Sequence, residues 1–107
     1  MKRVASVIGI AKENLGTYAE YHADVWPGVL ETLVKCNIRN YSIFVFGELL
    51  FSYFEYTGEN YEEDMLKMAA DPITQEWWKL QKPLQIPVNE KATDEWWHEL
   101  TELFHLD

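Results

Sequence analysis

Two aromatic-rich segments, residues 40–46 and 49–56, most constrain how this chain can fold. A Gly-Glu pair separates them, which predicts a β-hairpin with a tight connection. Both faces of this hairpin are apolar, because Phe44 and Phe46 lie on one face and an isoleucine and a valine on the other. A sheet with one wet face would alternate apolar and polar residues, so we expect both faces to be covered. A chain of 107 residues is too short to supply helices for both, and this predicts a homo-oligomer.

The chain before the hairpin predicts a strand and then a helix. Residues 3–10 are short and β-branched, typical of a strand. The apolar run 4–11 follows two basic residues, but it has only eight residues and no small-x-small cleavage site, so we expect a strand rather than a signal peptide. Apolar residues then recur every three or four positions over residues 12–35, which predicts an amphipathic helix. Pro27 lacks an amide donor, so the helix should kink or restart there.

Residues 59–81 return to helical spacing. The segment 59–70 carries acids in its first turn, where the helix dipole favours them. Asp71-Pro72 then predicts the start of a further helix over residues 73–81.

The last part of the chain predicts a loop and a final strand. Pro83 and Pro87 bracket a loop that runs to Lys91, and the apolar run 103–106 is a candidate strand. The predicted order is βαββα(α)β, the ferredoxin-like pattern of an α+β protein with an antiparallel sheet. We expect one domain over residues 1–107.

Composition excludes several classes of partner. Eighteen acids against nine bases give a formal charge of −9, and no cluster of lysine or arginine interrupts it, so we expect neither a nucleic acid nor an anionic membrane as partner. Hydrophobic residues make up 48% of the chain, which excludes disorder. Cys36 is the only cysteine, so no internal disulfide is possible, and a cytoplasmic location is expected.

Tyr18 and His22 are the most informative pair of polar aromatic residues. They are four residues apart and therefore neighbours on the apolar face of the predicted helix. One interpretation is a core tyrosine beside a hydrogen-bonded core histidine. The other is that this face lines a pocket, where a partly desolvated imidazole moves protons near neutral pH. The spacing alone leaves both open.

The tryptophans occur in two adjacent pairs. Trp77 and Trp78 point about 100° apart on a helix, so one can enter the core while the other faces a cavity. Indoles offer apolar faces to the C–H side of a sugar ring and an N–H to a hydroxyl, although core filling or a dimer contact explains them equally well. We assign Trp96-Trp97 to packing or an interface. Tyr41 is either a pocket donor or a half-buried strand residue.

Other chemical motifs are weak or missing from the sequence. His98 and His105 have no recognised metal-ligand spacing, so we expect no metal. Asp24, Glu48 and Glu55 are expected on solvated faces. No glycine-rich nucleotide loop and no serine elbow occurs, which excludes dinucleotide chemistry.

The ordered set of motifs resembles the L-rhamnose mutarotase family over essentially the whole chain. The matching motifs are Tyr18-x-x-x-His22, Trp26-Pro27, Asn40-Tyr41-Ser42-Ile43, Leu49-Leu50-Phe51, Trp77-Trp78 and Leu103-Phe104-His105-Leu106. The resemblance implies a cofactor-free homodimer of ferredoxin-like subunits, a dimeric α/β barrel, that interconverts the α and β anomers of L-rhamnose. Asp24, His105 and Trp96-Trp97 depart from the family pattern, which leaves L-fucose as a competing sugar.

The resemblance also implies roles for individual residues. His22 falls on the family's proton-donating histidine, Tyr18 and Tyr41 on its substrate-binding tyrosines, and Trp77 and Trp78 on its paired tryptophans. The expected function is therefore that of an aldose 1-epimerase acting on a 6-deoxy hexose. The second acid–base group is left open between a tyrosine, Asp24 and water. The alternatives are a non-catalytic sugar-binding dimer and a small monooxygenase of the same dimeric fold.

Overall fold

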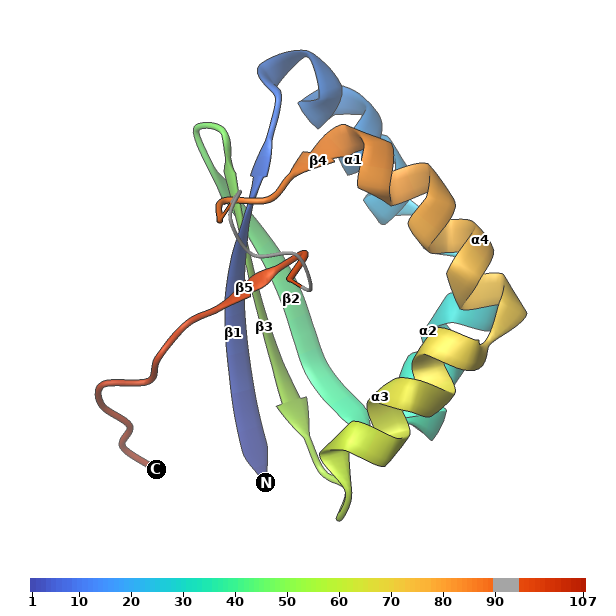
Figure 1. The fold of residues 1–107 in the computed structure, drawn as a ribbon, viewed down its shortest axis with the longest axis vertical. Coiled ribbons are helices and arrows are strands. Elements are labelled where there is room, and N and C mark those ends of the chain that lie inside the picture. Colours follow the sequence, from blue (N-terminus) through green and yellow to red (C-terminus); the bar gives the residue numbers. More distant parts are fainter. Residues whose placement is uncertain (90–94) are drawn as a thin grey trace.

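The structure is a computed structural model that describes residues 1–89 and 95–107 (Figure 1). In chain order its elements are β1 (Lys2–Ile10), η1 (Lys12–Asn14), α1 (Leu15–Ala23), α2 (Pro27–Lys35), β2 (Ile38–Phe46), β3 (Leu49–Tyr56), α3 (Tyr61–Ala70), α4 (Pro72–Gln81), η2 (Lys82–Leu84), β4 (Gln85–Ile86) and β5 (His98–Glu99). The predicted α+β order is confirmed, with two short strands in place of one at the end.

The strands form one antiparallel sheet in the order β2-β3-β1-β4, the strand order of a ferredoxin-like fold. β5 also pairs with β1, at Ser6 and Val7, while β4 pairs with it at Gly9 and Ile10. The predicted hairpin is β2 and β3, and Gly47 supplies the positive φ of 60° that its turn requires.

All four α-helices lie on one side of the sheet (Figure 1). We call that side the inner face, and alternate residues of β1, among them Val4, Ser6 and Ile8, are buried there. Ile8, Ile10, Leu50 and Tyr18 form the buried hydrophobic cluster.

The opposite side, which we call the outer face, carries many apolar residues that are exposed or half-buried in this chain. From the strand registers its apolar and aromatic residues are Ala5, Val7, Phe44, Phe46, Leu49, Phe51 and Tyr53, and it also carries Arg3, Ser42 and Glu55. Phe44 is 63% exposed and Phe46 is 78% exposed.

The predicted helix over residues 12–35 restarts at Pro27, as its missing amide donor requires. Pro27 is the first residue of α2, a position at which a backbone amide has no hydrogen-bond partner within the helix. Gly28 follows, and a Cβ on it would lie 2.8 Å from Cδ1 of Ile73 on α4. A glycine at this position therefore lets α2 approach α4 closely.

Side-chain caps begin the last two helices. Asn60 accepts a hydrogen bond from the Glu63 amide before α3, and Asp71 accepts one from the Thr74 amide at 2.8 Å before α4. The buried Asp64 of α3 also ties this helix to the sheet, because its carboxylate accepts hydrogen bonds from Tyr56 and Asn37.

The predicted end of the chain is wrong in two respects. Part of the expected loop before Lys91 is helix η2 and strand β4, while its residues 90 and 91 lie outside the described residues. The last strand is His98–Glu99 rather than residues 103–106. The amide of Leu100 still donates to the Ala5 carbonyl at 2.7 Å, but among the described strands none pairs with residues 103–106.

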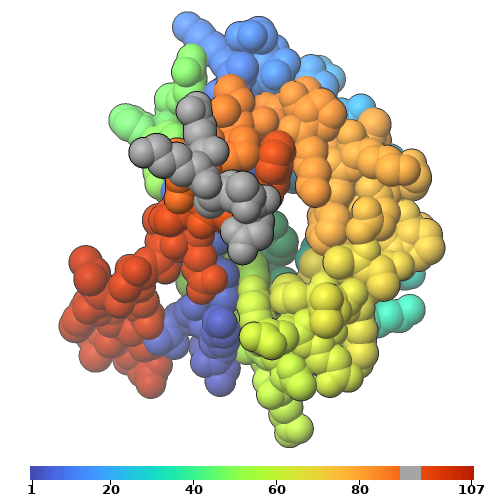
Figure 2. Space-filling view, viewed as in Figure 1, coloured from blue at the N-terminus to red at the C-terminus, as the bar shows by residue number. Residues whose placement is uncertain are grey.

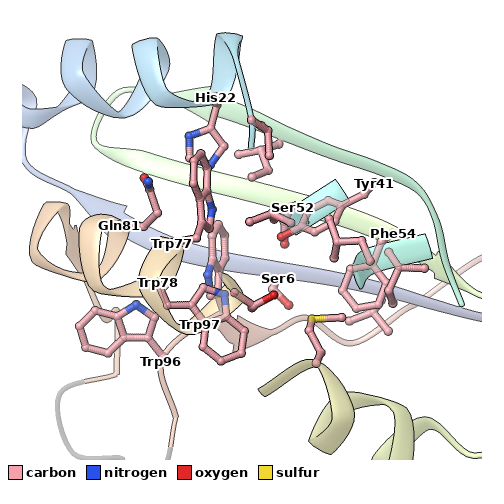
Figure 3. Close-up of a pocket in the computed structure, with 18 of the residues that line it drawn as sticks. Ser6, His22, Tyr41, Ser52, Phe54, Trp77, Trp78, Gln81, Trp96 and Trp97 are labelled. Atoms are coloured by element: carbon pink, nitrogen blue, oxygen red, sulfur yellow. The ribbon is translucent and has the colours of Figure 1, made fainter. Parts of the chain in front are cut away.

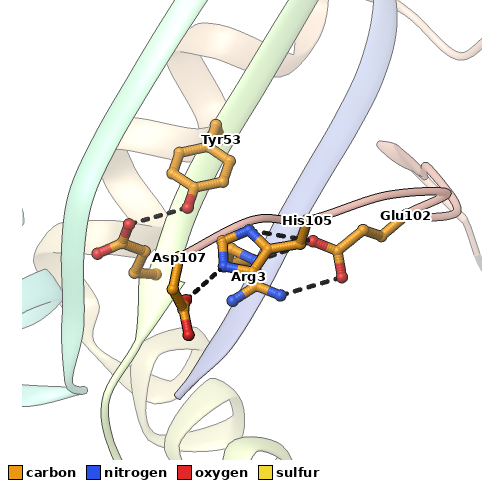
Figure 4. Close-up of polar contacts among 6 residues, drawn as sticks. Arg3, Tyr53, Glu102, His105 and Asp107 are labelled. Atoms are coloured by element: carbon orange, nitrogen blue, oxygen red, sulfur yellow. Dashed lines mark hydrogen bonds and ion pairs between the residues drawn. The ribbon is translucent and has the colours of Figure 1, made fainter.

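Polar contacts hold the residues after β5, which we call the tail (residues 100–107). The Arg3 guanidinium donates to both carboxylate oxygens of Glu102, at 2.8 and 3.2 Å, and His105 contacts Asp107 (Figure 4). The apolar side chains of the tail stay exposed, Leu103 at 95% and Phe104 at 81%. Figure 2 shows the tail projecting from the body of the molecule beside the N-terminal strand.

Candidate functional site

A pocket of about 680 Å³ lies between the inner face of the sheet and the helices (Figure 3). All five residues that the sequence singled out line it: Tyr18, His22, Tyr41, Trp77 and Trp78. The wall is mostly aromatic and aliphatic, with a few polar groups, as is usual for a small-molecule site. The interpretation that the Tyr18–His22 face lines a pocket is therefore confirmed.

His22 is a half-buried imidazole held in one orientation by Tyr18. Its ring stacks on the Tyr18 phenol with centroids 4.0 Å apart and an interplanar angle of 22°. Its Nδ1 lies 2.7 Å from the Tyr18 carbonyl oxygen, which can only accept, so Nδ1 carries the proton. The neutral ring then has its lone pair on Nε2. Burial lowers the pKa of His22, and the bond to the Tyr18 carbonyl opposes this, so the neutral base prevails at pH 7.

Tyr18 is buried and stays protonated. Desolvation, with a further effect of the nearby Tyr41, raises its pKa above the ordinary value, while a bond from Gln85 lowers it slightly. The Nε2 of Gln85 donates to the Tyr18 oxygen at 3.3 Å. Because the phenol oxygen accepts this bond, its own O–H remains available to donate to a bound molecule.

Trp77 is buried at the centre of an aromatic cluster on the helical side of the pocket. Its ring meets His22 edge to face with centroids 5.3 Å apart, and it meets Trp26 in the same way at 5.2 Å. Trp78 is half-buried and also lines the pocket. The expectation that the two indoles have different environments is confirmed.

Tyr41 lies on the sheet side of the pocket, where its ring packs against Phe54 with centroids 5.5 Å apart (Figure 3). Although 42% of the residue is exposed, desolvation raises its pKa to about 12, with a further effect of Tyr61. Its hydroxyl is therefore a neutral hydrogen-bond donor at pH 7.

Sequence reasoning did not place several residues of the pocket wall there, among them Gln81, Gln85, Trp96 and Trp97. Trp96-Trp97 does pack against the core, as expected, but both indoles also line the pocket, and Trp96 donates to Oε1 of Gln85 at 2.8 Å. Gln81 follows Trp77 by four residues on the same helix, and this spacing is the signal that could have placed it on this face.

The acidic candidates lie elsewhere. Asp24 is exposed and does not line the pocket, so it is removed as the second acid–base group. Glu48 is exposed, and Glu55 accepts hydrogen bonds from Asn40 and Tyr53 at 2.6 and 2.8 Å, away from the inner face.

Over residues 1–89 and 95–107, no three histidine, cysteine or acidic side chains are grouped to hold a metal ion. Within the same ranges, no helix has both the length and the apolar character needed to span a bilayer.

Comparison with known proteins assigns the chain to a family. Residues 3–106 match the family model described as L-rhamnose mutarotase. A protein of that name from Oceanobacillus iheyensis is 34% identical over 112 positions, covering 100% of both chains. One from Bacillus subtilis is 37% identical over 86 positions, covering 78% of this chain and 80% of that one.

The fold agrees with this assignment. The crystal structure of an L-rhamnose mutarotase from Formosa agariphila superposes with a TM-score of 0.77, covering 100% of both chains at 23% identity, which shows a shared fold. The family resemblance inferred from the sequence motifs is confirmed, and the chain belongs to the L-rhamnose mutarotase family.

Proposed function

We propose that this protein is a mutarotase that interconverts the α and β anomers of L-rhamnose in the pocket between α1, α4 and the sheet. The observation that carries the proposal is the neutral His22 imidazole, stacked on Tyr18 and edge-on to Trp77 at the wall of this pocket. An imidazole of this kind is suited to moving a proton near pH 7.

Mutarotation requires the proton on O1 to leave, the C1–O5 bond to break and O5 to gain a proton. We assign both transfers to Nε2 of His22, because O1 and O5 are bonded to the same carbon and one nitrogen can serve each in turn. The open aldehyde rotates about C1–C2, and the reverse transfers close the ring on its other face. No proton is gained or lost overall.

The tyrosines serve as neutral donors rather than as acids in this scheme. The raised pKa of Tyr18 makes it a poor proton donor, but its free O–H can hydrogen-bond a sugar oxygen. Tyr41 can bind another hydroxyl from the sheet side. Trp77 and Trp78 offer apolar faces to the ring and its C6 methyl group.

The test is proton NMR saturation transfer between the anomeric signals of L-rhamnose, with L-fucose in parallel. Exchange that accelerates with protein, and faster with L-rhamnose, is the expected result. Folded protein that binds sugar without accelerating exchange would indicate the sugar-binding alternative.

We also propose that the protein works as a homodimer in the cytoplasm. The outer face exposes Phe44 and Phe46, and the tail exposes Leu103 and Phe104. Isolated soluble chains rarely leave so many large apolar side chains uncovered, and a second copy would bury them. The lone buried thiol of Cys36 suits a reducing compartment.

A further inference from the structure

Gln81, the last residue of α4, is a buried amide without a hydrogen-bond partner in the part of the chain that the structure describes. The residue is 4% exposed, and both Nε2 and Oε1 are unpaired within residues 1–89 and 95–107. Buried polar side chains are nearly always hydrogen-bonded, because an unpaired group loses its hydration without compensation. An amide left in this state needs a reason.

The chain's two other glutamines provide the comparison. Gln85 uses both ends of its amide, one toward Tyr18 and the other toward Trp96. Gln75, on the exposed side of α4, donates to the Ala69 carbonyl. Gln81 alone of the three has both amide atoms unpaired among the described residues, and it lines the pocket.

Its position places the amide beside the proposed chemistry. Gln81 follows Trp77 by one helical turn, so the two share a face of α4. Figure 3 shows its side chain extending from α4 toward α1, which carries His22. A molecule that contacts Trp77 in the pocket therefore also lies close to Gln81.

An amide presents one acceptor and two donor hydrogens in a fixed plane. Two adjacent sugar hydroxyls present the matching set, one donating to Oε1 and the other accepting from Nε2. We propose that Gln81 is a specificity-determining residue that binds a pair of adjacent ring hydroxyls. This inference rests on the proposed function.

The pair must include the C3 hydroxyl. The free hydroxyls of the L-rhamnose ring, apart from the reacting one on C1, are on C2, C3 and C4. Either adjacent pair among them, C2–C3 or C3–C4, contains C3. The substrate class is thus a hexose with a free hydroxyl on C3 and on one of its neighbours.

The experiment combines one substitution in the protein with the removal of one hydroxyl from the sugar. Catalysed anomeric exchange is measured as kcat/KM for L-rhamnose and 3-deoxy-L-rhamnose, using wild type and Gln81→Met. Wild type should lose about tenfold or more on the deoxy sugar. Gln81→Met should lose about tenfold on L-rhamnose, and removing the C3 hydroxyl should then cost it less than about threefold.

A purely structural role for Gln81 would not produce this coupling. Gln75→Met, the same change outside the pocket, should keep wild-type kinetics with both sugars. Gln81→Leu serves as a second apolar variant if Gln81→Met does not fold. Wild-type kcat/KM in Gln81→Met, or the same tenfold deoxy-sugar penalty in wild type and variant, would overturn the inference.

Calorimetric dissociation constants for the same four combinations separate this inference from the proposed function. Coupling in binding without catalysed exchange would keep Gln81 as a hydroxyl-binding residue and overturn the mutarotase activity. Exchange by wild type without any coupling would overturn only the role of Gln81. Neither exchange nor binding by wild type would overturn both.

Discussion

The indole of Trp96 donates a hydrogen bond to Oε1 of Gln85 and thereby fixes which way the Gln85 amide faces. An indole N–H can only donate, so it must meet the amide oxygen. The amide nitrogen of Gln85 is then directed at Tyr18, whose oxygen accepts from it. A residue close to the C-terminal end thus leaves the Tyr18 O–H free for the pocket.

Trp96→Phe should therefore weaken substrate binding without unfolding the protein. The phenyl ring keeps the packing but lacks the donor, so the Gln85 amide can reverse and compete for the Tyr18 hydrogen. We expect KM for L-rhamnose to rise several-fold, about what one neutral hydrogen bond contributes, in exchange NMR. Trp97→Phe is the matched control because it leaves the Trp96–Gln85 bond intact. An equal effect of both substitutions would contradict this role.

His22→Asn should abolish most of the catalysis while sugar binding persists. The amide cannot take a proton from O1, and general acid–base help of this kind is typically about 10² to 10⁴-fold. Turnover is measured by saturation transfer and binding by calorimetry. The control is His98→Asn, which changes a histidine bonded to Glu95 instead. Near-normal turnover in His22→Asn would refute the proton-carrier role.

The pH profile should show an acid limb below the ordinary histidine pKa of about 6.5. Burial lowers the pKa of His22, so the active neutral form survives to more acid pH than a free imidazole would. We expect kcat/KM to be level at pH 7 and to fall with a midpoint below 6.5. A midpoint at or above 6.5 would contradict the buried environment.

The same shift predicts a stability difference. Because the folded pKa of His22 lies below the unfolded value, the unfolded chain binds more protons between the two, and stability falls as pH drops through that window. Denaturant unfolding at pH 7 and at pH 5.5 should show this loss in wild type. His22→Asn should show less of it, and an equal loss in both proteins would assign the effect to other groups.

Tyr56→Phe should destabilise the protein without changing the pocket. The substitution removes the hydroxyl that donates to Asp64 and accepts from the Asn60 amide at 3.1 Å, so both lose a partner. A lower denaturant midpoint is expected, with unchanged KM. Tyr53→Phe, which removes a hydroxyl bonded to Glu55, should cost less because half-exposed Tyr53 lies nearer to water. The reverse order would contradict this assignment.

Phe46→Glu should dissociate the proposed dimer. A carboxylate on the outer face would have to be desolvated against a second copy, which costs more than the association returns. Light scattering after size exclusion should give twice the chain mass of 12.6 kDa for wild type and the single-chain mass for the variant. Leu66→Glu, at an exposed site on α3, is the control. A monomeric wild type would refute the dimer.

The sequence predicted the elements whose signals are local. The Pro27 restart, the Asp71 cap and the hairpin at Gly47 each depend on a residue that fixes its own backbone. The strand at His98–Glu99 has no such signal, because it exists only where β1 offers a free edge. Residues 103–106 match a strand in composition, but composition does not specify a pairing partner, and none of the described strands pairs with them.

The residues of the candidate site also differ in whether a local sequence signal predicts them. Helical spacing placed Tyr18 beside His22, and it predicted different environments for Trp77 and Trp78 without saying which of them is buried. Gln85 lies in β4 and Trp96 lies just before β5, so their hydrogen bond joins two segments that meet only in the folded chain. No local sequence pattern encodes such a contact. The catalytic and binding roles of the five predicted residues stay predictions, since shared pocket lining does not test them.

The glycine at position 28 allows a close contact between α2 and α4, two helices that both line the pocket. Val29 of α2 and Trp77 of α4 are part of the pocket wall, so the distance between these helices affects the width of the site. A methyl group at Gly28 would meet the Ile73 side chain, and we expect it to move α2 away from α4 and loosen the contact of Trp26 with Trp77. Neither Gly28 nor Ile73 is part of the pocket wall. Adapting this protein to a bulkier sugar therefore begins at this contact between two helices, where one added carbon widens the site and leaves every residue of its wall unchanged.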